Sequence, residues 1–91
     1  MNRYLIERTI PGAGRLSTDE LQSIAQKSNE VLVDMAGRAQ WLQSYVADDA
    51  IVCVYLATDP KALYEHGRCG GFPVDAVREV RGVIDPTTAA V

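Results

Sequence analysis

Hydrophobic residues follow two different periods along this chain. Residues 3–9 form a short run typical of a β-strand, and Pro11 and Gly12 then interrupt it with residues that fix or free the backbone. After this loop the apolar positions recur about every 3.6 residues, which is the period of an amphipathic helix. These positions are Leu21, Ile24, Ala25, Leu32 and Met35. The pattern predicts a strand, a loop and a long helix.

Local signals set the ends of this first helix. Ser17 is placed to cap the backbone amide of Glu20, and the Glu20 side chain is placed to reach back to Ser17, as in a capping box. Gly37 is suited to end the helix in a left-handed conformation. We therefore expect the helix to run from Thr18 to Ala36.

Two further strands and a second helix are predicted next. Segments 40–47 and 50–57 are rich in aromatic and β-branched residues, and the acidic pair at 48–49 suits a tight turn, so they are expected to form a hairpin. Asp59-Pro60 provides a helix cap and a proline at the first helical position, while Gly70-Gly71 provides a stop. Residues 77–84 alternate imperfectly as a last strand.

The predicted order of elements is β-α-β-β-α-β. With two right-handed crossovers, this order gives an α+β ferredoxin-like fold, in which a four-stranded antiparallel sheet carries both helices on one face. A chain of 91 residues has room for one hydrophobic core, so we expect a single domain over residues 1–91. The tail, residues 85–91, is expected to be poorly ordered unless a neighbour holds it.

Both faces of the predicted hairpin are apolar. The odd positions hold Trp41, Tyr45, Ile51, Cys53 and Tyr55. The even positions hold Leu42, Val46, Val52, Val54 and Leu56. A sheet with one face in water alternates apolar with polar residues, and these strands do not. We therefore expect a second copy of the chain to cover the open face, giving a homodimer of the dimeric α/β-barrel type.

The composition of the chain argues against several classes of binding partner. The chain is 47% hydrophobic and 23% charged, and its net charge of −3 offers no basic surface to nucleic acid or anionic lipid. The apolar run at the amino terminus stops at Glu7, which makes it too short for a secretory signal. We expect a soluble, cytoplasmic protein that binds neither nucleic acid nor a membrane.

The candidate chemistry centres on one histidine. On the second predicted helix, His66 shares a face with Leu63, Gly67 and Gly70, so its imidazole is expected to point toward the sheet. Imidazole titrates near neutral pH and is a common metal ligand. Other polar or reactive groups that could line a pocket between the helices and the sheet are Glu7, Ser28, Asn29, Tyr45 and Cys53, and Arg68 could hold an anion near the end of the second helix.

Each candidate also has a purely structural explanation. His66 would be a hydrogen-bonded core residue, and Cys53, between two valines, a small buried hydrophobic residue. Glu7 would form an ion pair with an arginine, and Tyr45 would pack in the dimer. Arg68 would interact with the dipole at the carboxyl end of its helix.

Several stretches of the chain resemble a known family. They are Tyr4-Leu5-Ile6-Glu7-Arg8 with Pro11-Gly12-Ala13, the hairpin from Trp41 to Tyr55, and Glu65-His66-Gly67-Arg68 leading into Gly71-Phe72-Pro73. Over residues 3–88 the chain is similar to a family of small ferredoxin-like proteins of unknown function, some of whose members are described as nickel-binding. The resemblance implies the dimeric α/β-barrel fold and marks His66 as the counterpart of a family histidine.

Nickel is the cofactor that this resemblance implies, as a divalent transition metal with His66 as a ligand. The nickel-binding relatives have further polar ligand candidates where this chain has Ala25, Ser28 and Gly70. Nickel favours imidazole nitrogen together with several other donors in fixed geometry, so one histidine per chain supplies too few. A site shared across a dimer would need carboxylate, thiolate or water to complete the set.

Three functions remain open at this point. The first is a dimer that binds a metal ion or a small molecule in a pocket near His66. The second is a cofactor-free enzyme of the dimeric α/β-barrel kind, an oxygenase or isomerase with His66 as acid or base, which is an analogy at the level of the fold. The third is a protein-interaction module, whose RNA-binding form would need a basic aromatic motif that residues 50–57 lack.

Overall fold

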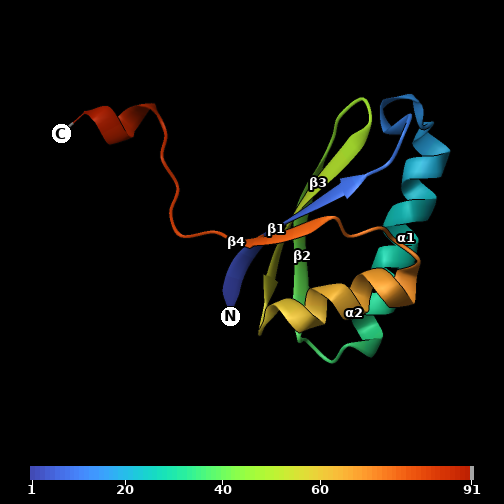
Figure 1. The fold of residues 1–91 in the computed structure, drawn as a ribbon. Helices are drawn as coiled ribbons and strands as arrows, with labels where there is room; N and C mark the ends of the chain where they lie inside the picture. The colour runs from blue at the N-terminus through green and yellow to red at the C-terminus, as the bar shows by residue number, and fades with distance from the viewer. Residues whose placement is uncertain (91) are drawn as a thin grey trace.

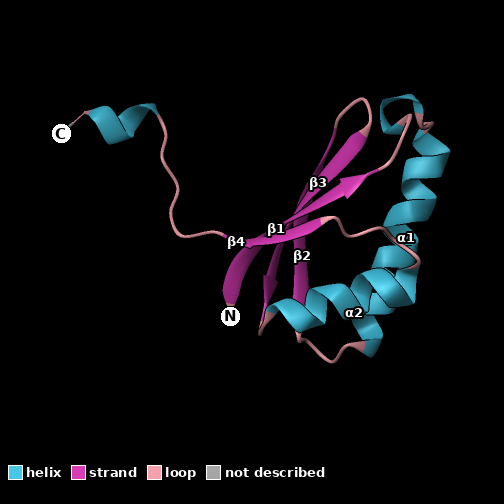
Figure 2. Ribbon diagram, viewed as in Figure 1, coloured by secondary structure: helices cyan, strands magenta, loops and turns pink. Residues whose placement is uncertain are grey.

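Four strands form one antiparallel sheet in the computed structural model, which describes residues 1–90. The strands stand in the order β2-β3-β1-β4, and both helices lie on one side of the sheet (Figures 1 and 2). This arrangement confirms the predicted α+β, ferredoxin-like βαββαβ fold. The elements are β1 (Asn2–Thr9), α1 (Thr18–Asp34), β2 (Ala39–Val46), β3 (Ala50–Ala57), α2 (Pro60–Gly70) and β4 (Ala76–Glu79), with short 3₁₀ turns η1 (Ala13–Arg15) and η2 (Pro86–Ala89).

The two faces of the sheet differ because side chains alternate along each strand. On the face beneath the helices, Tyr4 of β1 lies opposite Tyr55 of β3, and Ile6 lies opposite Cys53; all four side chains are buried. The other face, which we call the open face, has no helix over it within residues 1–90. Its central apolar side chains are Leu5, Val52, Val54 and Leu56, each only partly buried.

The helix ends follow the local signals in the sequence. Ser17 Oγ accepts a hydrogen bond from the Glu20 amide at 3.1 Å, and the Glu20 carboxylate accepts one from the Ser17 amide, so the predicted capping box is confirmed. The α1 helix ends at Asp34, two residues earlier than expected. The reason is that Ala36, with φ of 52°, already enters the left-handed region that was assigned to Gly37 alone.

The β2 strand contains an irregularity that the sequence did not predict. Its pairing with β3 shifts between Trp41 and Gln43, where Leu42 is an extra residue, as in a β-bulge. Trp41 and Ser44 therefore both face the helices, although three positions separate them. Tyr45 faces the other way and is 58% exposed, so the expected grouping of Trp41 and Tyr45 on one face is wrong.

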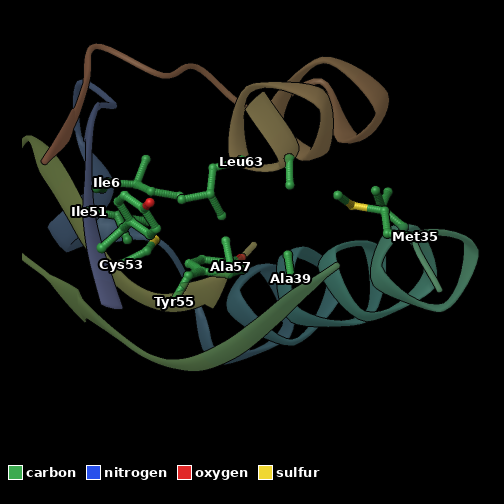
Figure 3. Close-up of a cluster of buried hydrophobic side chains, with 12 residues drawn as sticks. Ile6, Met35, Ala39, Ile51, Cys53, Tyr55, Ala57 and Leu63 are labelled. Atoms are coloured by element: carbon green, nitrogen blue, oxygen red, sulfur yellow. The ribbon is translucent and has the colours of Figure 1, made fainter. Parts of the chain in front are cut away.

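The core lies between the sheet and the helices, where Leu63 of α2 packs over Ile6 and Tyr55 (Figure 3). Farther along α2, Gly67 allows a close approach of the backbone. A Cβ atom there would lie 2.5 Å from Val74 Cγ2 and 3.1 Å from the Phe72 carbonyl oxygen. The segment that follows α2 is therefore held tightly against the helix on its way back to β4.

The last strand is shorter than the predicted segment 77–84. It runs only from Ala76 to Glu79, and its final backbone contact is the Val80 amide, which donates to the Arg3 carbonyl at 2.8 Å. Residues 81–90 are exposed and extend away from the sheet (Figure 1), with Asp85 capping the turn η2. Val91, the end of the tail 85–91, lies outside the described residues. Neither helix has the length and apolar character needed to cross a lipid bilayer.

Candidate functional site

A cavity of about 220 Å³ lies between the helices and the sheet. It forms beneath the first half of α1, where Leu21 and Ile24 are only partly buried, whereas Val31 in the second half and Met35 just after the helix are buried. The residues that line it are Arg8, Ile10, Leu21, Ile24, Ala25, Ser28, Trp41, Ser44, Val46, Ile51, Cys53, Tyr55, His66 and Phe72. The lining is mostly apolar, with a few polar groups at one end.

Three of these polar groups form a chain of hydrogen bonds. Ser28 Oγ lies 3.1 Å from His66 Nε2 and 3.2 Å from the Tyr55 hydroxyl, so one serine on α1 joins α2 to β3. His66 is fully buried, and its second nitrogen, Nδ1, has no hydrogen-bond partner within residues 1–90. A buried polar atom without a partner is rare in folded proteins and calls for an explanation.

The His66 imidazole is held in its neutral form. Burial lowers its pKa below the ordinary value of 6.5, and the nearby positive charge of Arg8 lowers it further, while the contact with Ser28 raises it. The ring stacks on Phe72, with centroids 5.7 Å apart, and is tilted against Tyr55 at 5.4 Å. Burial likewise raises the pKa of Tyr55, so its phenol stays protonated.

Arg8 brings a positive charge into this otherwise apolar region. Its side chain is only 4% exposed because Arg8 follows Tyr4 and Ile6 on the inward face of β1. The guanidinium donates from Nε to Cys53 Sγ at 3.4 Å and from Nη1 to the Pro73 carbonyl at 2.7 Å, and it lies over the Phe72 ring. No carboxylate of residues 1–90 lies within 4.0 Å of it.

The residues expected to form the site are only partly brought together. His66, Ser28 and Cys53 line the cavity. Glu7 lies on the open face and forms an ion pair with Arg78 at 2.7 Å, as its structural explanation proposed. Asn29 and Arg68 are exposed on α1 and α2, and the bulge turns Tyr45 outward. These four side chains do not line the cavity.

Sequence reasoning did not select Arg8, Trp41, Tyr55 or Phe72 as site residues. The signal for Arg8 was present, because Tyr4, Ile6 and Arg8 occupy alternate positions of the first strand and therefore share a face. A charged residue at the end of an apolar alternation would normally be placed at the surface. Its burial is therefore the most informative feature of the site.

The residues of one chain do not fit a nickel centre. Within residues 1–90, no group of three or more histidine, cysteine or acidic side chains is placed to hold a metal ion. Of the donors in the cavity, His66 Nε2 contacts Ser28, and Cys53 accepts a hydrogen bond from the Arg8 guanidinium. A fixed positive charge beside the thiol opposes the approach of a divalent cation.

Comparisons with known proteins agree with this fold. A family model described as "Nickel responsive protein SCO4226-like" matches residues 4–80. Among solved structures, the chain is similar to the crystal structure of SCO4226 from Streptomyces coelicolor A3(2), with a TM-score of 0.73 and 16% identity, covering 90% of this chain and 99% of that chain. No curated protein matches the chain significantly in sequence.

Proposed function

The chain belongs to the family of SCO4226-like nickel responsive proteins, and from this premise we propose that it binds a small organic molecule in the cavity beside His66. The observation that carries this proposal is the coincidence of an apolar cavity with a buried imidazole nitrogen that lacks a partner. Ligand sites are typically apolar hollows with a few convergent polar groups.

The volume of the cavity limits the size of the ligand. An apolar cavity of about 150 Å³ can hold a benzene molecule, so a cavity of about 220 Å³ suits one or two rings or a short aliphatic body. Trp41, Leu21 and Ile24 would contact the apolar part of such a molecule. The polar end of the cavity, with Ser28, Tyr55 and His66, would fix its orientation.

The family name links its members to nickel, and this bears on the choice between a metal and an organic ligand. We favour the organic ligand because the Arg8 charge lies beside the two side chains, His66 and Cys53, that a metal would need. A nickel titration followed by elemental analysis tests this choice. Nickel bound at micromolar concentration by the wild type, and lost in His66→Gln, would contradict it.

We propose further that the protein acts as a homodimer, with the open face of the sheet covered by a second copy. The support is the row of partly buried aliphatic side chains on that face, flanked by Tyr45, which is 58% exposed. Apolar surface of this extent is typical of an interface between copies. The cavity lies on the other side of the sheet, so dimerisation would leave it accessible.

Binding can be tested with the single tryptophan of the chain, Trp41, whose indole lines the cavity. Its indole N–H gives one cross-peak in a nitrogen–proton correlation spectrum. Three neutral probes, benzamide, cinnamamide and 2-naphthamide, are added in turn. We expect at least one of them to shift this cross-peak in a saturable way.

A matched pair of variants shows whether the probe occupies the cavity. Ala25→Phe places a ring in the cavity lining and should abolish the shift, whereas Gln26→Phe places the same ring on the exposed side of α1 and should preserve it. If Ala25→Phe binds a probe as well as Gln26→Phe does, the proposed function is wrong.

A further inference from the structure

The Arg8 guanidinium is a buried cation whose hydrogen-bond partners are all neutral. Cys53 Sγ and the Pro73 carbonyl accept from it, and the face of the Phe72 ring lies 5.5 Å away. Arginine is almost never fully buried unless it is paired with an anion. The desolvation of a charge costs several kcal/mol, and neutral acceptors offset only part of that cost.

The acidic side chains nearest to these elements are engaged elsewhere. Glu7, the neighbour of Arg8, points to the open face and pairs with Arg78. Asp75 accepts a hydrogen bond from the Thr9 amide, and Glu65 pairs with Arg38 on the outside of α2. The described part of the chain therefore provides no counter-ion for Arg8, and an anion that pairs with it would have to come from outside.

The positive charge also lies close to the other polar groups of the cavity. It acts electrostatically on both the His66 imidazole and the Tyr55 phenol. The His66 ring, whose Nδ1 has no partner, and the Arg8 guanidinium both lie against the Phe72 ring, at the polar end of the cavity. One negatively charged group at this end would be paired with Arg8 and would lie within reach of neutral hydrogen-bonding groups.

We infer that the ligand of the cavity is a small organic anion, a carboxylate on an apolar body of one or two rings, with its carboxylate against Arg8. This inference rests on the proposed function and specifies the chemical class of its ligand. A single guanidinium in an apolar lining matches one negative charge, and its planar fork of donors matches the two oxygens of a carboxylate. A more highly charged phosphate would leave negative charge uncompensated.

The test compares each neutral amide with the carboxylate of the same shape: benzamide with benzoate, cinnamamide with cinnamate, and 2-naphthamide with 2-naphthoate. Dissociation constants are measured at pH 7.5 from the Trp41 cross-peak and by calorimetry. Because a charge-assisted hydrogen bond is about twice as strong as a neutral one, we expect the acid to bind roughly ten-fold tighter than its amide, or more.

Three variants test whether this preference depends on Arg8. Arg8→Met keeps an unbranched apolar side chain and removes the charged guanidinium, so the ratio of the two dissociation constants should fall to about one or reverse. Arg3→Met makes the same change on the same strand, at an exposed position of the opposite face, and should leave the ratio unchanged. Arg8→Lys retains the charge and should retain part of the preference.

The outcomes separate this inference from the proposed function. If the amides bind and the acids bind no tighter, the cavity is a ligand site but its ligand is not an anion. If neither series binds, both proposals fail. If Arg8→Met does not fold, two measurements on the wild type test the inference instead. They are the ratio of the acid and amide dissociation constants and the shift of the Arg8 Nε–H resonance when the acid binds. A ratio near one, or a resonance that does not shift, overturns the inference.

Discussion

Ser28 Oγ and His66 Nε2 lie 3.1 Å apart and join the two helices inside the core. The same serine oxygen contacts the Tyr55 hydroxyl at 3.2 Å, so a single small side chain satisfies polar groups from α2 and β3 at once. This contact holds the imidazole against the cavity. It also makes the site dependent on a residue whose own side chain does not titrate near neutral pH.

Replacing Ser28 with alanine should therefore destabilise the protein more than the loss of one hydroxyl suggests. The change leaves both the imidazole and the phenol without a partner, and each unsatisfied buried group costs about 1–3 kcal/mol. Urea denaturation measures the effect. Ser23→Ala, on the exposed side of the same helix, is the control and should change the free energy of unfolding little. Equal stability of the two variants would contradict this account.

Stability should depend on pH through His66. The pKa of this residue is lower in the folded state than its ordinary value of 6.5. Above pH 6.5 the imidazole is neutral in both states, so its contribution to stability is fully present. As the pH falls below 6.5, the unfolded chain takes up a proton that the folded chain does not, and stability declines by at most about 1.4 kcal/mol per pH unit.

This dependence can be measured from urea midpoints between pH 5 and pH 8. Because the chain has a single histidine, His66→Gln should remove the slope between pH 5 and 6.5 while retaining the fall at lower pH that carboxylates cause. The imidazole proton resonance should also titrate below pH 6.5. A resonance that titrates above this value would show that the ring is stabilised in its charged form.

The open face of the sheet gives a prediction about assembly. Val54 lies on this face in β3, a central strand, so Val54→Lys places a charge in the middle of the proposed interface. The wild type should sediment as a dimer and this variant as a folded monomer. Tyr64→Lys introduces the same charge at an exposed position of α2 and should remain dimeric. A wild type that sediments as a monomer at high concentration would contradict the proposed dimer.

The close approach at Gly67 predicts the cost of a single methyl group. In Gly67→Ala, the new Cβ would overlap Val74 and press on the Phe72 carbonyl, so the segment after α2 must move. Overpacking of this kind costs about 1–3 kcal/mol, and it should also weaken ligand binding because Phe72 lines the cavity. Gly82→Ala, where no atom lies within 4 Å, should leave the melting temperature nearly unchanged.

The order of helices and strands was predictable because its signals are local. The capping box at Ser17 and the Asp59-Pro60 start of α2 each depend on a few neighbouring residues, and both are present in the structure. The inward orientation of His66 was predictable for the same reason, since helical spacing fixes the face that a residue occupies. These features required no knowledge of tertiary packing.

The rest of the site could not be read from local patterns. The bulge in β2 changes the face of Tyr45, and an extra residue in a strand carries no distinctive sequence signal here. The burial of Arg8 depends on α2 and the Phe72–Pro73 segment, which reach it from far along the chain. The separation of α1 from the sheet, which creates the cavity, is likewise a property of packing.

The extra residue in β2 also affects how relatives of this protein should be compared. Leu42 lies outside the regular pairing with β3, so Trp41 and Ser44 both face the helices although they are three positions apart. In a regular strand, residues on one face are an even number of positions apart. In a homologue that lacks the counterpart of Leu42, the counterparts of Trp41 and Ser44 would be two positions apart and would both face the interior. An alignment that counts residues across the strand without a gap would therefore match inward residues of one protein with outward residues of another, and would misassign ligand specificity.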